Sequence, residues 1–96
     1  MKKIWKYELQ LIDRQLVPIG DSAAKPLSVA EQNGKLTMWV ELDTSCVDVG
    51  IFAICVDIFG TGNPLRDTGA YLGTVPMSNG LIWHVYTEML QRGDAK

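Results

Sequence analysis

Residues 27–43 read LSVAEQNGKLTMWVELD, and this stretch decides the fold. Two runs that carry regularly spaced apolar residues, 27–32 and 35–43, flank the dipeptide Asn33-Gly34. Asn-Gly supplies both positive-φ positions of a type I′ turn, which makes it the strongest short-range signal for a β-hairpin. We therefore predict that the two runs are antiparallel strands joined by a tight turn.

A second Asn-Gly dipeptide, Asn79-Gly80, stands in the same way between residues 70–77 and 81–86. It predicts a second hairpin of the same kind. Pro76 lies close to this turn and cannot donate a hydrogen bond to a neighbouring strand, so we expect an edge position, a bulge or a longer loop there. The two hairpins together indicate a compact antiparallel β-protein.

Three further segments have the pattern of strands. Residues 4–12 alternate between apolar and polar positions, which is typical of a half-buried strand. Residues 15–19 form a short candidate strand that Pro18 confines to an edge or a strand end. Residues 51–59 are almost continuously apolar, interrupted only by Asp57, so we expect a central strand that is covered on both faces.

The C-terminal segment has a different pattern. Residues 87–92 contain good helix formers and Gly93 follows them, which is consistent with one or two helical turns. The whole pattern predicts a single, mainly β domain over residues 1–96. We expect a small antiparallel β-sandwich or a partly open barrel of about six strands.

Composition limits the partners. The net charge of −2 and the pI near 5.2 argue against a nucleic acid polymer, whose phosphates require a basic face. No segment approaches the roughly 18 to 20 apolar residues that cross a membrane, and the opening MKKIWKY lacks the apolar core of a signal peptide. We expect a cytoplasmic protein in which Cys46 and Cys55 are reduced thiols.

Large side chains are frequent for so short a chain, with three Trp, three Tyr and four Met. Trp and Tyr are enriched at protein interfaces. We therefore expect a homo-oligomer, and we name Trp5 and Trp39 as candidate partner-binding residues. Trp39 is placed by the alternation on the more polar face of its strand.

Three stretches in this order resemble a family of short proteins encoded by phages and prophages, for which no activity is assigned. They are KIWKY at 3–7, IFGTGNP at 58–64, and YLGT at 71–74 with WHVY at 83–86. Family members often have His where this chain has Asn63. The resemblance implies a phage origin and a small accessory role, such as blunting a host defence.

The segment Gly60-Thr61-Gly62-Asn63 is the most chemical-looking loop. Two glycines allow backbone N–H groups to converge on an anion, and the Thr and Asn side chains add donors. The segment is not a dinucleotide fingerprint, because a third glycine and a following helix are missing. Its structural alternative is a tight turn that ends a central strand.

Aromatic residues and the single histidine complete the candidate ligand site. Tyr71 could stack on a ring, and His84 could contact a ligand or act as a base. The alternative for His84 is a packed, hydrogen-bonded side chain, and core packing explains most of the rings. Alternation along the strand places the His84 and Trp83 side chains on opposite faces of the sheet.

Catalysis and metal binding have little support. The sequence has no nucleophile elbow and no P-loop, and a zinc site would have to combine His84 with both cysteines without the usual paired spacing. We predict no cofactor. Carboxylates that converge in space could still act as a catalytic pair, although we expect these acids to be solvated. The candidates are Glu41, Asp43, Asp48, Asp57 and Asp67.

These observations lead to one functional hypothesis and two alternatives. We expect a non-enzymatic protein of phage type that sequesters a nucleotide-like signal, with residues 60–63 holding phosphate and aromatic rings holding the base. The first alternative is an inhibitor that blocks a host protein through an apolar surface around Trp39 or Trp5. The second is a virion or assembly accessory protein whose strand edges pair with other subunits.

Overall fold

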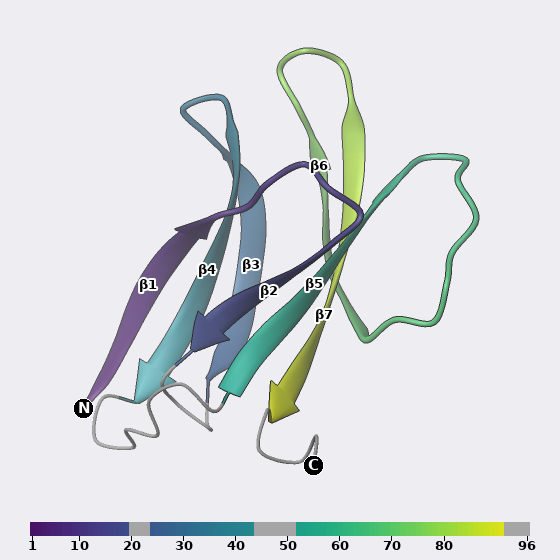
Figure 1. Ribbon diagram of the computed structural model, residues 1–96. Coiled ribbons are helices and arrows are strands. Elements are labelled where there is room, and N and C mark those ends of the chain that lie inside the picture. The colour runs from purple at the N-terminus through teal and green to yellow at the C-terminus, as the bar shows by residue number, and fades with distance from the viewer. Residues whose placement is uncertain (20–23, 44–51, 92–96) are drawn as a thin grey trace.

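The computed structural model describes residues 1–19, 24–43 and 52–91, and these residues form seven strands and no helix (Figure 1). The strands build two antiparallel sheets, one ordered β1-β4-β3 and the other β2-β5-β7-β6. Their bounds are β1 (Lys2–Glu8), β2 (Arg14–Ile19), β3 (Lys25–Gln32), β4 (Lys35–Asp43), β5 (Phe52–Gly60), β6 (Ala70–Pro76) and β7 (Ile82–Gln91). The predicted β-sandwich is confirmed, with one strand more than expected.

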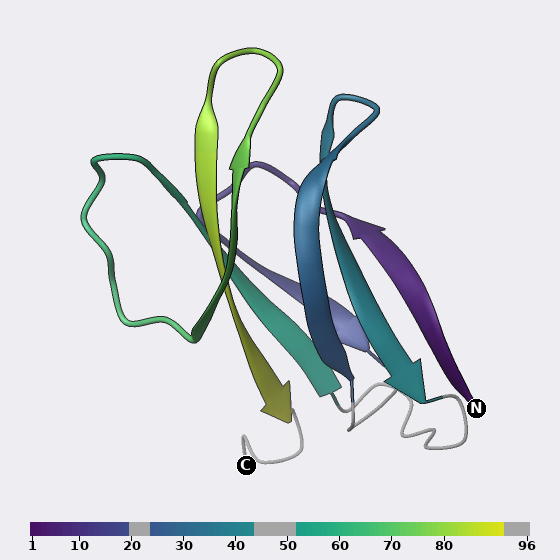
Figure 2. The same ribbon diagram turned by 180° about the vertical axis from the view of Figure 1, so that it is seen from behind.

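The two sheets bury their facing sides against each other. Apolar residues at every second position of β4, among them Met38 and Val40, face Ile54, Val56 and Val85 of β5 and β7, and all five are fully buried. Along one flank β3 and β6 lie side by side, as both views show (Figures 1 and 2). On the opposite flank β1 and β2 are not paired, so the sandwich is open there.

The hairpin between β3 and β4 has the turn that the sequence predicts. Asn33 and Gly34 both have positive φ values, 53° and 77°, as a type I′ turn requires. The strands on either side pair in register from Gln32 opposite Lys35 onward. The prediction for this turn is confirmed.

The second predicted hairpin, between β6 and β7, is confirmed. Its turn is not the predicted type I′ turn, because the longer loop that was one expectation beside Pro76 is found instead. Only Gly80 has a positive φ, 92°. The Gly80 N–H donates to the Met77 carbonyl at 3.0 Å, and the Met77 N–H donates to the Leu81 carbonyl at 2.7 Å. The loop therefore has one residue more than the two of a type I′ turn. Within it the Asn79 side chain accepts a bond from the Leu81 N–H.

The central and edge positions follow the prediction. β5 lies between β2 and β7, and its residues 53–59 are all buried. Pro18 lies in β2 and Pro76 in β6, which are the two edge strands of that sheet. Cys55 is a buried free thiol, as expected, whereas Cys46 lies outside the described residues.

The helical turn expected at residues 87–92 is replaced by strand over residues 87–91, while residue 92 lies outside the described residues. β7 continues to Gln91 and pairs with β5 from Trp83 opposite Gly60 to Gln91 opposite Phe52. This pairing outweighs an intrinsic helix preference that is weak by comparison. No helix in the described part of the chain is long and apolar enough to cross a membrane.

Candidate functional site

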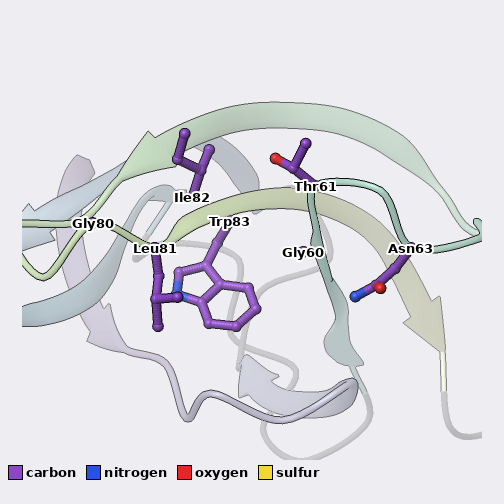
Figure 3. Close-up of a pocket in the computed structure, with 7 residues that line it drawn as sticks. All are labelled: Gly60, Thr61, Asn63, Gly80, Leu81, Ile82 and Trp83. Atoms are coloured by element: carbon purple, nitrogen blue, oxygen red, sulfur yellow. The ribbon is translucent and has the colours of Figure 1, made fainter.

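An open pocket of about 410 Å³ lies where β5 ends and β7 begins (Figure 3). The register explains its position: Gly60 is opposite Trp83, so the turn after β5 meets the hairpin tip before β7. The lining residues come from these two segments only. They are Gly60, Thr61, Asn63, Gly80, Leu81, Ile82 and Trp83.

The turn after β5 brings an amide and an indole together. Asn63 donates its backbone N–H to the Gly60 carbonyl at 3.2 Å, and Gly62 provides the positive φ, 92°, that this turn needs. A Cβ atom on Gly60 would lie 3.0 Å from Asn63 Nδ2 and 3.5 Å from Trp83 Cζ3. The missing side chain at residue 60 therefore lets the Asn63 amide and the Trp83 ring approach the same strand end.

Trp83 has the most unusual polar atom of the pocket. Its Nε1 is buried and has no hydrogen-bond partner among the described residues. Leu81, whose exposed fraction is 49%, lines the same pocket (Figure 3). Buried donors are nearly always paired in native proteins, so this nitrogen is a candidate to bond a ligand or a water molecule.

The pocket is electrically neutral, because none of its seven lining residues is charged. The sequence suggested that backbone N–H groups of residues 60–63 bind a phosphate. The Asn63 N–H is not free to do so, because it donates to the Gly60 carbonyl within the turn. What remains is an indole face, one indole donor and one carboxamide, which can both donate and accept. This set suits a flat, uncharged ring that carries hydrogen-bonding groups.

Three hydroxyl groups and His84 form a hydrogen-bonded chain on the outer face of the four-stranded sheet, opposite the face that carries Trp83. Thr61 Oγ1 is 2.7 Å from His84 Nε2, and Thr74 Oγ1 is 3.0 Å from His84 Nδ1. Tyr71 joins the chain through its hydroxyl, 2.5 Å from Thr74 Oγ1. His84 is thus hydrogen-bonded at both ring nitrogens, and Trp83 points to the other side of the strand, as alternation predicts.

The predicted ligand-binding residues therefore fall into two neighbouring groups. Gly60, Thr61 and Asn63 line the pocket, while the side chain of Thr61 turns away from Trp83 toward the histidine (Figure 3). Tyr71 and His84 belong to the hydroxyl chain, and Gly62 shapes the turn without lining the pocket. From the sequence, Trp83 was only one of several aromatic residues that could stack on a ring or meet a partner, and it was not named as a site residue, although alternation indicated its face.

Comparison with known proteins gives one result. The family model described as Domain of unknown function (DUF7352) matches residues 1–95. The chain belongs to this family. No curated protein and no solved structure matched the chain, and the family description assigns no activity. The function of this DUF7352 protein therefore has to be argued from its own residues.

The DUF7352 chain has a buried ionic cluster that sequence reasoning missed. Asp57 is 2% exposed and receives Arg14 Nε at 2.6 Å on Oδ1, Arg66 Nη2 at 3.0 Å on the same oxygen, and the Thr68 hydroxyl at 2.7 Å on Oδ2. Burial by itself raises the pKa of Asp57, but the hydrogen bonds from Arg14, Thr68 and Arg66 outweigh it and hold the pKa below its usual value. The signal was available: a lone acid in a buried strand needs charged partners.

This cluster organises the connection between β5 and β6. Arg66 and Thr68 belong to that connection and both bind Asp57, while the Arg66 guanidinium also lies over the Phe59 ring, 4.6 Å from its centroid. Arg14 donates to the Asp67 carbonyl at 3.0 Å. The long loop is thereby tied to the outer face of the four-stranded sheet. Asp57 is not the solvated acid that the sequence suggested.

The two candidate partner residues lie on the three-stranded sheet. Trp39 is half-buried in β4, opposite Lys6 and Ser28 in register. Trp5 is in β1 and 52% of its surface is exposed. Among the described residues no group of three or more His, Cys, Asp or Glu side chains could hold a metal ion.

Proposed function

We propose that this DUF7352 protein acts by binding rather than catalysis, and that the pocket beside Trp83 holds the ring of a nucleotide-like ligand. The observation that carries the proposal is the buried, unpartnered Trp83 Nε1 at an open pocket of about 410 Å³. A heterocycle with an acceptor nitrogen or oxygen would supply the missing partner.

Two further groups support a base-like ligand. The indole offers a face for stacking, which is tolerant of the kind of base. Asn63 presents a carboxamide, whose donor and acceptor match the edge of a nucleobase. Leu81 lines the same pocket and is half exposed, and exposed side chains change rotamer in picoseconds to nanoseconds, so this wall of the pocket can adapt to a ligand.

The neutral lining favours the base over the phosphate as the recognised part. Arg66, whose loop follows the turn, is engaged by Asp57, and the Asn63 N–H is used in the turn. We therefore assign base binding to the pocket and leave phosphate groups outside it. In the phage-type setting that the sequence resembles, such a protein would sequester a signalling nucleotide in the cytoplasm of the host.

The substitution Trp83→Phe tests the assignment. It keeps an aromatic face but removes the indole donor. We expect binding to weaken up to about tenfold, the equivalent of one hydrogen bond, while the free protein still folds, because phenylalanine keeps an aromatic ring in this position. Trp39→Phe is the matched control, on the outer face of the other sheet, and should bind as the unmodified protein does.

The measurement is thermal unfolding with a panel of the four common nucleosides, their 3′,5′-cyclic monophosphates, and ADP-ribose. A ligand at about 100 times its dissociation constant adds about 2.7 kcal/mol to stability, which is a shift of many degrees for a domain of this size. No shift with any member at millimolar concentration contradicts the proposal. Binding that is unchanged in Trp83→Phe but lost in Trp39→Phe contradicts the assigned location.

A further inference from the structure

β1 stands out among the four edge strands of the two sheets. The described edge strands are β1 and β3 of one sheet and β2 and β6 of the other. Proteins protect such edges from pairing with other chains by prolines, bulges and charged side chains, lysine above all. β2 contains Pro18, β3 contains Pro26 with a register shift beside it, and β6 contains Pro76 with a shift after Tyr71.

β1 has neither a proline nor a bulge, and only its three lysines protect it. Its seven residues pair with β4 without a register shift. Among the described strands β4 is its only partner, and both views place β1 at the outer flank of the molecule (Figures 1 and 2). The backbone groups on its far side therefore present a complete template for another strand.

The exposed side chains of β1 are also unusual for a free edge. Ile4 is 63% exposed on the outer face of the sheet, and Trp5 is 52% exposed on the other face. Contact with another chain would remove both from water, and aromatic residues are enriched in the buried centre of interfaces. Exposed apolar residues on both faces of an edge that lacks proline and bulge favour a partner that adds a strand.

The sequence of β1 is complementary to itself. A two-fold axis perpendicular to the sheet places residues of the same face opposite each other, so the axis can pass through Ile4, Trp5 or Lys6. With Trp5 on the axis, Lys2 of each copy lies opposite Glu8 of the other, Ile4 lies opposite Lys6, and all seven residues of the strand are paired. This register sets two pairs of opposite charges at the ends of the interface.

The neighbouring registers are unfavourable. With Ile4 on the axis, Lys2 of each copy faces Lys6 of the other. With Lys6 on the axis, the two Lys6 side chains face each other. Like charges directly opposite each other destabilise a strand pair, so the sequence selects the register centred on Trp5.

We infer that a second copy of this chain is the partner, and that two copies pair antiparallel through β1 with Trp5 opposite Trp5. The result is a continuous six-stranded sheet of order β3-β4-β1-β1-β4-β3. The interface is isologous, as in most homodimers. The pocket beside Trp83 takes no part, so this inference does not depend on the proposed ligand.

Charge reversal tests the register. Lys2→Glu sets Glu opposite Glu8 at both ends of the interface, and Glu8→Lys sets Lys opposite Lys2. We expect each variant to raise the dimer dissociation constant about tenfold or more. Lys3→Glu is the matched control: it changes the net charge by the same amount in the same strand, but its residue faces Tyr7, so a much smaller effect is expected.

Mixing the two weakened variants gives the sharpest result. A Lys2→Glu chain and a Glu8→Lys chain have opposite charges at both ends of the interface, so a heterodimer should form at concentrations where each variant alone is monomeric. Loss of the intramolecular contacts Lys2–Glu41 and Glu8–Lys35 cannot produce such a rescue. Native mass spectrometry resolves the two chains, and sedimentation gives the dissociation constants.

Two results would overturn the inference. One is a monomer at every concentration up to millimolar. The other is a dimer whose stability is the same in Lys2→Glu and in Lys3→Glu and that shows no heterodimer preference on mixing. Circular dichroism of each variant should show a folded protein, because Lys2, Lys3 and Glu8 are all exposed.

Discussion

Replacing Asp57 by alanine will lower the free energy of unfolding by about 3 kcal/mol, toward the lower end of the range for breaking a buried ion pair. The carboxylate is almost fully buried and accepts bonds from Arg14, Arg66 and Thr68. Its loss leaves two guanidinium groups without their counterion and releases the loop between β5 and β6. The loss stays at the lower end because both arginine side chains remain in partial contact with water.

Asp67→Ala is the control for this substitution. Asp67 lies in the same loop and its side chain is exposed. Its replacement removes the same charge as Asp57→Ala but should lower the free energy of unfolding by less than about 0.5 kcal/mol. Chemical denaturation of the three proteins at neutral pH gives the comparison. Equal losses for the two variants would show that the Asp57 cluster does not hold the loop.

The same cluster gives a pH dependence with a defined sign. The pKa of Asp57 is lowered in the folded protein, so the folded state binds this proton less readily than the unfolded state. Its contribution is therefore complete above the unfolded pKa of about 3.9 and is lost as the pH falls through the lower pKa of the folded state. The stability difference between the unmodified protein and Asp57→Ala should be constant from pH 7 to about pH 5, and should shrink in more acidic buffer.

Replacing Gly69 by alanine will cost about 3 kcal/mol or more, because the new methyl group has no room. A Cβ atom at residue 69 would lie 2.0 Å from the Thr87 carbonyl oxygen and 2.6 Å from its carbon. These are backbone atoms of a strand paired on both sides, so they cannot turn aside as a flexible side chain would. The entry into β6 would have to move away from β7.

Gly62→Ala separates this steric effect from backbone strain. Nothing lies within 4 Å of a Cβ atom at Gly62, but its φ of 92° disfavours other residues, at a cost of about 1 to 2 kcal/mol. Denaturation midpoints of both variants provide the test. If Gly69→Ala is no more destabilising than Gly62→Ala, residue 69 does not lie as close to the β7 backbone as the structure places it.

Local signals predicted the parts of this fold that local chemistry determines. Asn33-Gly34 formed the type I′ turn because both residues accept positive φ. At Asn79-Gly80 the same dipeptide lies in a longer loop, in which the Asn79 side chain accepts the Leu81 N–H. The nearby Pro76, and not the dipeptide, was the signal that allowed a longer loop here.

Long-range pairing decided the features that sequence reasoning missed. Residues 87–91 favour helix by composition but extend β7, because β5 offers a complete ladder over that length. Asp57 interrupts an apolar run, yet its two arginines lie 43 and 9 residues away in the chain. The sequence identified the loop at residues 60–63, but the orphaned Trp83 nitrogen depends on how two turns meet in space.

The most direct test of the binding proposal is a nitrogen-15 NMR spectrum of the tryptophan indole groups, recorded while adenosine and then the other nucleosides are added. The protein has three tryptophans, and Trp83→Phe identifies the signal of interest. Our account predicts that the Trp83 Nε1–H signal, unbonded in the free protein, shifts downfield and saturates with a nucleoside, while those of Trp5 and Trp39 stay in place. A Trp83 signal that no nucleoside moves at millimolar concentration would contradict it.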